Sequence, residues 1–276
     1  MKERVYKDVY PGQIHFEKKN HIAYLKFDNP KNLNALSYSM FASINEIFDT
    51  MSGDRDILGV ILTGEGRSFI VGADLKELDK MKAEGDYDYF FLESYRDARV
   101  YIHDTMNKIV NFDRPTLCAV NGYALGGGAE VAMCCDIRIM SSKAKVGFPE
   151  CGIGGIPAYT GVSRALRILG IAVTKEMMMT ARHYTAEEAL QRGFTSEVCE
   201  PEKLMDRATE MMSLIVSRAP VCEKYLKLFL NNSAEMSYQA SLEYERNMVA
   251  ITQATEDAIE GSKAFIEKRP PQWKNG

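Results

Sequence analysis

Three consecutive glycines in the middle of the chain, residues 126–128, constrain its fold more than any other feature. They follow an apolar run at 117–120 that is typical of a buried strand, and they precede residues 129–135, which favour a helix. Glycine lets the backbone approach a ligand or another segment closely. The N–H groups at a helix start are unpaired, and the helix dipole favours negative charge there. The turn therefore predicts a phosphate site, an oxyanion site or a tightly packed turn without a ligand.

Two common nucleotide-binding motifs do not describe this turn. A dinucleotide motif requires G-x-G-x-x-G at the first strand–helix junction and an acidic residue about 20 positions later. Here the glycines are contiguous and lie mid-chain. A P-loop requires Gly-Lys-Ser/Thr after the turn, and Ala129-Glu130 stands there instead. The G-x-S-x-G motif of serine hydrolases is also missing from the sequence.

Two glutamates near the turn are candidates for acid–base chemistry. Glu130 lies two residues after Gly128, where a carboxylate can also simply stabilise a helix by about 0.3–1 kcal/mol. Glu150 follows Phe148-Pro149 and is equally compatible with a position on the surface. If the two converge, their pKa values separate, so that one holds a proton while the other is ionised. Such a pair can take a proton from water and return one to carbon.

The order of the remaining patterns indicates an α/β fold. A strand–helix–strand order is typical of β-α-β units with parallel strands. After Pro220 the pattern is almost continuously helical to residue 268. We therefore predict a catalytic domain at 1–205 and a helical domain at 206–276. Strands are predicted within 14–28 (a hairpin turning at 18–20) and at 58–62, 117–120 and 137–140, with 121–128 as a turn, and helices at 37–49, 75–81, 87–111, 129–135, 186–192 and 202–218.

Charge, cysteine and histidine patterns exclude several classes of protein. A net charge of −4 gives no support for nucleic-acid binding, which favours a basic face. No apolar run reaches the roughly 18–20 residues that span a bilayer, so no membrane partner is expected. The N-terminal residues show no secretory or transit pattern. Six cysteines without C-x-x-C spacing indicate buried thiols in a reducing, cytoplasmic compartment, and four histidines without metal-ligand spacing predict no metal site.

Six segments of the chain resemble motifs of the enoyl-CoA hydratase/isomerase (crotonase) family. They occur in the family's order over nearly the whole chain, which is far more specific than any one motif. They lie at residues 29–36, 69–75, 114–115, 119–128, 149–150 and 264–269.

The resemblance implies a fold, an assembly and a reaction. The fold is a spiral of ββα repeats with a C-terminal helical region that builds homotrimers, commonly paired as homohexamers. The reaction is that of a lyase of fatty acid metabolism, which hydrates an α,β-unsaturated acyl-CoA. Coenzyme A is then part of the substrate, and no further cofactor is implied.

The resemblance also implies roles for individual residues. Glu130 and Glu150 match the two catalytic carboxylates, and the amides of Ala73 and Gly127 match the oxyanion hole. Lys76 is matched to a coenzyme A phosphate, and Phe265 and Lys268 to the border of the nucleotide in the assembled oligomer. The predicted substrate contacts are Gly72, Asp74, Lys76, Gly126, Phe265 and Lys268, together with Tyr159, which departs from the family pattern.

The sequence departs from the family pattern after Glu150. The common form L-G-x-x-P-G-x-G-G-T reads I-G-G-I-P-A-Y-T-G-V at 153–162, so Ala158 and Thr160 replace glycines and Tyr159 stands between them. This loop, with an aromatic stripe at residues 87–95, predicts a pocket for a cyclic or otherwise unusual acyl group, although such a stripe is also typical of core or interface. Double-bond isomerisation, C–C hydrolysis or decarboxylation of the same enolate, or a non-catalytic binding role, are the alternatives. The stripe consists of Tyr87, Tyr89, Phe90, Phe91 and Tyr95.

Overall fold

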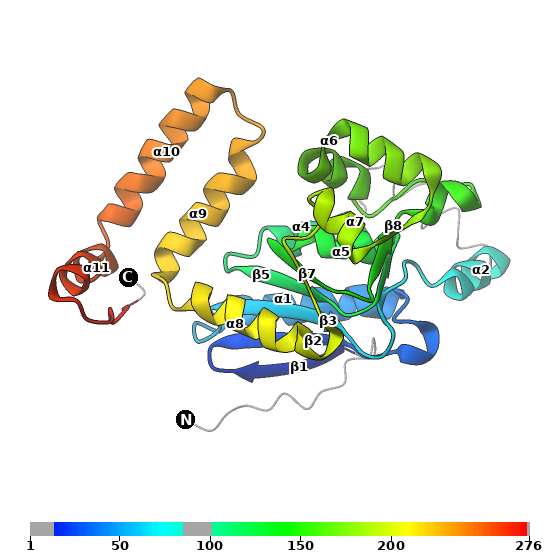
Figure 1. Ribbon diagram of the computed structural model, residues 1–276, viewed down its shortest axis with the longest axis horizontal. Helices are drawn as coiled ribbons and strands as arrows, with labels where there is room; N and C mark the ends of the chain where they lie inside the picture. The colour runs from blue at the N-terminus through cyan, green and yellow to red at the C-terminus, as the bar shows by residue number, and fades with distance from the viewer. Residues whose placement is uncertain (1–13, 85–100, 275–276) are drawn as a thin grey trace.

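Two β-sheets form the body of the molecule, in a computed structural model that describes residues 14–84 and 101–274 (Figure 1). The larger sheet has the strand order β1-β2-β3-β5-β7-β10, and the smaller has the order β4-β6-β8-β9. The larger sheet consists of β1 Ile14–Lys19, β2 Ile22–Phe27, β3 Gly59–Gly64, β5 Thr116–Val120, β7 Ile137–Ser141 and β10 Glu197–Cys199. The smaller sheet consists of β4 Ser68–Ile70, β6 Tyr123–Leu125, β8 Lys145–Gly147 and β9 His183–Thr185.

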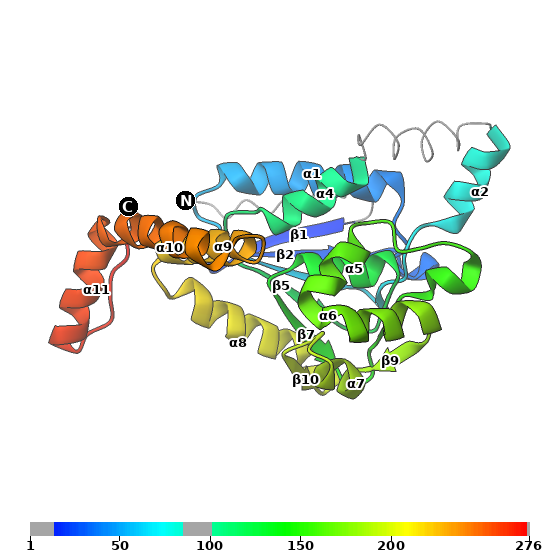
Figure 2. The same ribbon diagram turned by 90° about the horizontal axis from the view of Figure 1, so that it is seen from above.

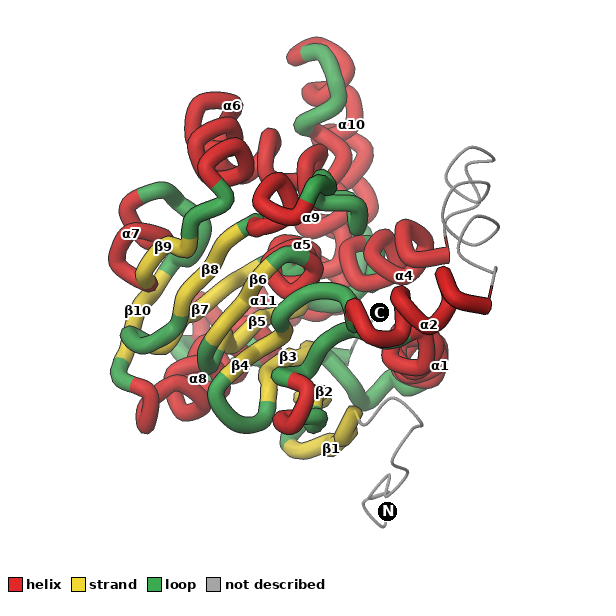
Figure 3. Tube along the Cα trace, turned by 90° about the vertical axis from the view of Figure 1, so that its right-hand side faces the viewer, coloured by secondary structure: helices red, strands yellow, loops and turns green. Residues whose placement is uncertain are grey.

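Successive turns of the chain repeat one pattern. A strand of the larger sheet is followed by a strand of the smaller sheet and then by a helix, so that β3 precedes β4, β5 precedes β6 and β7 precedes β8. Equivalent strands of successive turns pair in parallel, and Figure 3 shows them side by side. This arrangement confirms the predicted α/β spiral of ββα repeats.

Helices cover both faces of the larger sheet (Figure 2). Val60 and Leu62 of β3 point into the main core, which α1, α4 and α5 complete, whereas Ile61 points to the opposite face beneath α8. The helices of the body are α1 Tyr38–Gly53, α2 Leu75–Glu84, α4 Tyr101–Val110, α5 Gly127–Cys134, α6 Gly161–Thr180, α7 Ala186–Gln191 and α8 Leu204–Val216. Short 3-10 helices are η1 Pro30–Asn32, η3 Pro149–Ile153 and η4 Pro201–Lys203.

Helix α8 belongs to the body by its packing. Leu204, Ala208 and Met212 recur every four residues and bury one stripe of the helix against the larger sheet. The predicted domain boundary at 205/206 therefore falls inside a helix that covers the sheet. The division into a catalytic and a helical domain stays a prediction.

The C-terminal region is helical almost throughout, as predicted, but it is not one helix. The chain forms α9 Pro220–Ser233, α10 Tyr238–Gln253 and α11 Glu256–Glu267, with two short breaks in the helical pattern. Ser237 and Thr255 interrupt it, because each side chain accepts a hydrogen bond from a backbone N–H three residues on and starts a new helix. In Figures 1 and 2 these helices extend away from the sheets. Within the described ranges, no helix combines the length and the hydropathy needed to cross a bilayer.

Two smaller predictions also change. The hairpin between β1 and β2 turns at Asn20 and His21, not at 18–20, and both residues have the positive φ that such a turn requires. The segment 121–128, predicted as a turn, contains β6, which forms by pairing with β4 and β8. Of the helix predicted at 87–111, α4 is observed. The remainder and the whole aromatic stripe lie outside the described residues.

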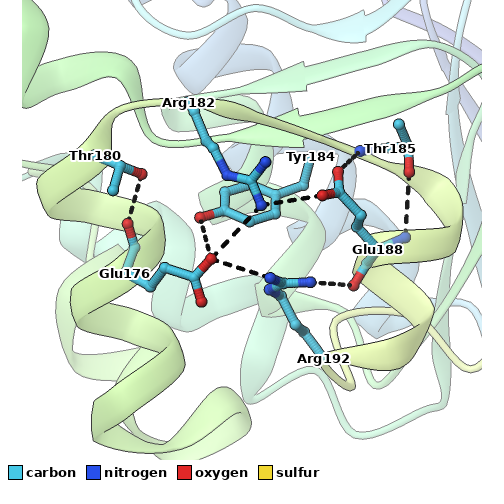
Figure 4. Close-up of polar contacts among 7 residues, drawn as sticks. All are labelled: Glu176, Thr180, Arg182, Tyr184, Thr185, Glu188 and Arg192. Carbon is cyan, nitrogen blue, oxygen red and sulfur yellow. Dashed lines mark hydrogen bonds and ion pairs between the residues drawn. The ribbon is translucent and has the colours of Figure 1, made fainter.

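A cluster of charged side chains around Tyr184 fixes the end of α6 to α7 (Figure 4). The buried Tyr184 ring lies between the guanidinium groups of Arg182 and Arg192, at 4.1 and 4.9 Å from its centroid. Glu176 on α6 accepts hydrogen bonds from the Tyr184 hydroxyl and from Arg192, at 3.2 and 3.0 Å. Glu188 on α7 accepts one from Arg182 at 3.0 Å. The cluster thus holds one end of the helix whose other end begins at the candidate site.

Candidate active site

The glycine turn begins α5 and is shaped by close approach. Gly126 has φ 52° and ψ −122°, a conformation that residues with a side chain rarely adopt. A Cβ at Gly126 would also lie 2.5 Å from Oε1 of Glu150, so the Glu150 carboxyl lies directly against the turn. A Cβ at Gly128 would overlap the carbonyl of Ile70 on β4. The turn therefore needs glycine both for its backbone conformation and to let α5 pack on the smaller sheet.

The segment containing Ala73 runs beside this turn. The Leu36 amide donates to the Gly72 carbonyl at 2.7 Å and the Leu36 carbonyl accepts from the Asp74 amide at 2.9 Å, which leaves the Ala73 amide outside this bridge. The Gly127 nitrogen lies close to Gly72: a Cβ placed on Gly72 would stand 3.6 Å from it. Among the described residues, neither the Ala73 nor the Gly127 amide donates a hydrogen bond to a protein acceptor. Two such N–H groups suit an oxygen that gains negative charge during a reaction.

Glu130 is a buried carboxyl held by backbone. It lies in the first turn of α5 with 1% of its surface exposed. Its Oε1 accepts hydrogen bonds from the amides of Tyr159 at 2.8 Å and Gly161 at 2.6 Å. Burial raises the pKa of Glu130 to about 8, the charge of Glu150 adds to this, and the two amides oppose it. Glu130 is therefore able to hold or release a proton near neutral pH.

Glu150 supplies the second carboxyl. It lies in η3, directly after Pro149, and burial raises its pKa above the ordinary range of a glutamate. Its Oε2 is buried and has no hydrogen-bond partner among the described residues. The Glu150 charge adds to the rise in the pKa of Glu130, so the two carboxyls lie within electrostatic range of each other. The structure thus brings Glu130, Glu150 and the glycine turn together.

The loop 158–161 forms one wall beside Glu130. The Tyr159 ring is buried and meets the Phe41 ring edge-on, with centroids 5.4 Å apart. The ring also lies against the Gly127 backbone, where a Cβ would stand only 2.8 Å away from it. Thr160 has φ 75°, in the left-handed region. Tyr159 therefore belongs to the site through both its amide and its ring.

Sequence reasoning missed two features of this wall. His103 was assigned no role in binding or catalysis, and its Nε2 lies 2.7 Å from the carbonyl oxygen of Ala158. The amide of Gly161 was assigned no role, yet it holds Glu130. No local sequence pattern predicts either contact. The departure from the family pattern at 158–160 indicated only that this loop borders the acyl group.

Other predicted substrate contacts lie next to Ala73 but have structural partners. Asp74 caps α2: its Oδ1 accepts from the amides of Lys76 and Glu77 at 3.0 and 3.3 Å, and its Oδ2 accepts from Asn32 at 2.7 Å. Lys76 is exposed in the first turn of the same helix. A role in substrate binding stays a prediction for both.

Phe265 and Lys268 lie at the end of α11. Figures 1 and 2 both place this helix on the opposite side of the molecule from α2. The Phe265 side chain is 85% exposed. One chain alone does not bring these residues to the site, so the predicted contact with the nucleotide requires a second subunit and stays a prediction.

Within the described part of the chain, no group of three or more His, Cys, Asp or Glu side chains is arranged to hold a metal ion. The expectation that no cofactor is needed stays untested by this geometry.

Comparison with known proteins places this geometry in a family. The family model described as enoyl-CoA hydratase/isomerase matches residues 17–276. A probable mitochondrial enoyl-CoA hydratase of Dictyostelium discoideum is 36% identical over 259 residues, which cover 94% of this chain and 90% of the relative. A short-chain-enoyl-CoA hydratase of Clostridium acetobutylicum is 36% identical over 260 residues, 94% of this chain and 96% of the relative.

Solved structures give the same result. The crystal structure of an enoyl-CoA hydratase from Bacillus anthracis superposes with a TM-score of 0.88 at 30% identity. The superposition covers 95% of this chain and 99% of that one. The likeness therefore extends over the body and the C-terminal helices together.

Proposed function

Because the chain belongs to the enoyl-CoA hydratase/isomerase family, we propose that it adds water reversibly across the double bond of an α,β-unsaturated acyl-CoA. One observation carries the proposal: the carboxyl of Glu150 lies against the glycine turn, and the buried carboxyl of Glu130 lies in the first turn of the helix that the glycines begin. Relatives named as hydratases of short-chain enoyl-CoA and crotonyl-CoA support it.

The thioester carbonyl would accept hydrogen bonds from the Ala73 and Gly127 amides. These amides draw electron density toward the oxygen and make the β-carbon electrophilic. The oxygen of a water molecule then bonds to the β-carbon as one carboxylate takes a proton from it. The electron pair of the double bond moves to form an enolate, and the other carboxyl gives its proton to the α-carbon.

The raised pKa values of both carboxyls suit this exchange. Burial raises the pKa of both carboxyls, and the value of about 8 for Glu130 lets that carboxyl hold its proton near neutral pH. One member can then act as base while the other acts as acid. After hydration, the carboxyl that acted as base carries the proton and the carboxyl that acted as acid has lost it. Proton exchange with solvent then restores the starting protonation states.

The altered loop favours a second candidate reaction on the same enolate. The Tyr159 ring lies against Gly127 and restricts the space beside the proposed oxyanion position. Double-bond isomerisation needs no water there, and C–C hydrolysis or decarboxylation would each form a thioester enolate, held at the same oxyanion position, when the C–C bond breaks. The departure of this loop from the family pattern supports a cyclic or otherwise unusual acyl group as the natural substrate, and the Tyr159 ring would limit the size of that group.

The test is turnover of crotonyl-CoA and a panel of cyclic enoyl-CoA thioesters, followed by mass spectrometry. Hydration adds the mass of one water to the product, and isomerisation adds none. Glu130→Gln and Glu150→Gln should each abolish most of the turnover, by roughly a hundredfold or more. Glu223→Gln is the matched control, because Glu223 on α9 is also a half-buried acid with a raised pKa but lies outside the site. Full activity of both site variants would reject the assignment.

Assembly and compartment are part of the proposal. We infer a homotrimer or homohexamer, because the C-terminal helices expose large apolar side chains such as Ile259, Phe265 and Ile266. In such an assembly Phe265 and Lys268 would border the nucleotide bound by a neighbouring subunit. All six cysteines are free thiols, which supports a reducing, cytoplasmic location. No cofactor beyond the coenzyme A of the substrate is proposed.

A further inference from the structure

We propose that His103 is a positioning residue for Glu130, acting through the backbone of the loop 158–161. The inference rests on the proposed function in so far as Glu130 is a catalytic acid or base. It adds a residue of α4 to the candidate site, whereas the glycine turn and the two carboxyls belong to α5 and η3.

The first link is the hydrogen bond between His103 and Ala158. The Nε2 of His103 lies 2.7 Å from the Ala158 carbonyl oxygen. A carbonyl oxygen only accepts, so Nε2 carries the proton and donates it. Further along the loop, the amides of Tyr159 and Gly161 both donate hydrogen bonds to Oε1 of Glu130. The side chain of His103 thus anchors the peptide adjacent to the Tyr159 amide.

The loop needs such an anchor because its conformation is strained. Thr160 lies between the two donating amides and has φ 75° and ψ 2°. A β-branched residue rarely adopts this left-handed conformation, which persists only where the surroundings fix it. Without external ties, a relaxed Thr160 would turn the amides of its neighbours away from Glu130.

Helix α4 provides a second tie on the same face. Asn107 stands four residues after His103, which is one helical turn. Its Oδ1 accepts from Arg164 at 2.9 Å, and Nε of Arg164 donates to Oγ1 of Thr160 at 2.9 Å. One face of α4 therefore holds Ala158 directly, through His103, and Thr160 indirectly, through Asn107 and Arg164.

The position of the two amides decides the charge state of Glu130. Burial and the neighbouring Glu150 favour its protonated form, and the hydrogen bonds from Gly161 and Tyr159 favour the ionised form. If the loop relaxes, the ionised form loses its donors. The Ala73 and Gly127 amides are fixed by segments other than this loop, and the Tyr159 ring stays packed against Phe41, so binding of the thioester should change little.

The experiment compares His103→Leu, which fills similar space without a donor, with His103→Gln, whose side-chain N–H can still reach the Ala158 carbonyl. His103→Leu is expected to lower kcat about tenfold or more while KM stays within about twofold, since small misplacement of a catalytic group is costly. His103→Gln is expected to restore most of kcat. Carbon-13 NMR of the glutamate carboxyls, with the Glu130 signal identified by its loss in Glu130→Gln, should show a higher pKa of Glu130 in His103→Leu than in the wild type or His103→Gln.

Lys108→Gln is the matched control. Lys108 follows on the same helix but pairs with Asp49 of α1, at 2.8 Å, and has no contact with the loop in the described residues. It should leave kcat and the Glu130 titration unchanged. If His103→Leu does not fold, His103→Asn, whose shorter amide cannot reach Ala158, takes its place with the same expected results.

The outcomes separate the inference from the proposed function. An unchanged Glu130 titration in His103→Leu, or equal losses in His103→Leu and His103→Gln, would overturn the positioning role. A wild type that hydrates no enoyl-CoA would overturn the proposed function instead. The NMR titration would still decide on His103 in that case, because it requires no turnover.

Discussion

The amide of Gly161 donates a hydrogen bond of 2.6 Å to Oε1 of Glu130. This contact joins the first residue of α6 to the first turn of α5, across 31 positions of sequence. A Cβ at position 161 would overlap the Glu130 side chain, so any other residue there would force the Glu130 carboxyl to move. The contact therefore sets both the place of the carboxyl and the start of the following helix.

Gly161→Ala should remove most of the activity with little loss of the fold. The added methyl group pushes the Glu130 carboxyl away from its two amides, and we expect kcat to fall about a hundredfold with KM nearly unchanged. Gly155→Ala is the control, since the nearest atom to a Cβ there is a carbonyl oxygen at 3.8 Å. Steady-state kinetics of both variants check this, and an active Gly161→Ala would contradict it.

The stability of the protein should depend on pH through Glu130. Its folded-state pKa, about 8, lies above the ordinary value of 4.5. Between these pH values the folded chain binds more protons than the unfolded chain, so the free energy of unfolding falls as pH rises. Glu130→Gln removes this term and should be more stable than the wild type at alkaline pH, by on the order of a few kcal/mol.

Thermal unfolding at pH about 5.5 and about 8.5 measures the effect, since the two values bracket most of the titration. The difference in melting temperature between the two pH values should be smaller in Glu130→Gln than in the wild type. Glu187→Gln, an exposed change on α7, should behave like the wild type. A larger pH difference in Glu130→Gln would contradict the pKa direction.

Tyr159→Ala should widen the range of acyl groups. The ring fills space between Phe41 and Gly127, so its removal opens a volume next to the proposed oxyanion position. We expect the ratio of kcat/KM for a bulky or cyclic enoyl-CoA to that for crotonyl-CoA to rise about tenfold, and stability to fall by about 3 kcal/mol. Tyr159→Phe keeps the ring and should keep the wild-type ratio. An unchanged ratio in Tyr159→Ala would show that the ring does not border the acyl group.

Asp74 allows a test that separates capping from substrate binding. Asp74→Ala removes the acceptor for the Lys76 and Glu77 amides and should destabilise the protein by about 1 kcal/mol. Asp74→Ser retains a capping oxygen and loses the carboxylate. If Asp74 acts as a cap alone, Asp74→Ser should keep both the stability and the KM of the wild type. A raised KM in Asp74→Ser with normal stability would instead assign the carboxylate to the substrate.

The candidate site was predictable where its residues carry a local pattern. The glycines at 126–128 mark a strand–helix turn, and Glu130 follows them directly. The approach of Glu150 was not derivable from the residues, since it depends on β7 and β8 returning the chain to the turn. Only the resemblance to a family indicated it in advance.

Other features lack a local pattern altogether. His103 and Ala158 are 55 positions apart, and nothing near either residue predicts their contact. The three-residue strand β6 exists because β4 and β8 flank it, not because its own residues favour a strand strongly. The break at Ser237 contains neither proline nor glycine, so the helical pattern seemed to continue through it.

The three glycines at the start of α5 each lie against a different part of the molecule. Gly126 accommodates Glu150, Gly127 accommodates the Tyr159 ring, and Gly128 accommodates the Ile70 carbonyl. A mutation at any one of them is thus compensated only by a change in a different, distant segment. A change of chemistry by mutation is therefore more readily made in the side chains around the turn than in the three glycines themselves.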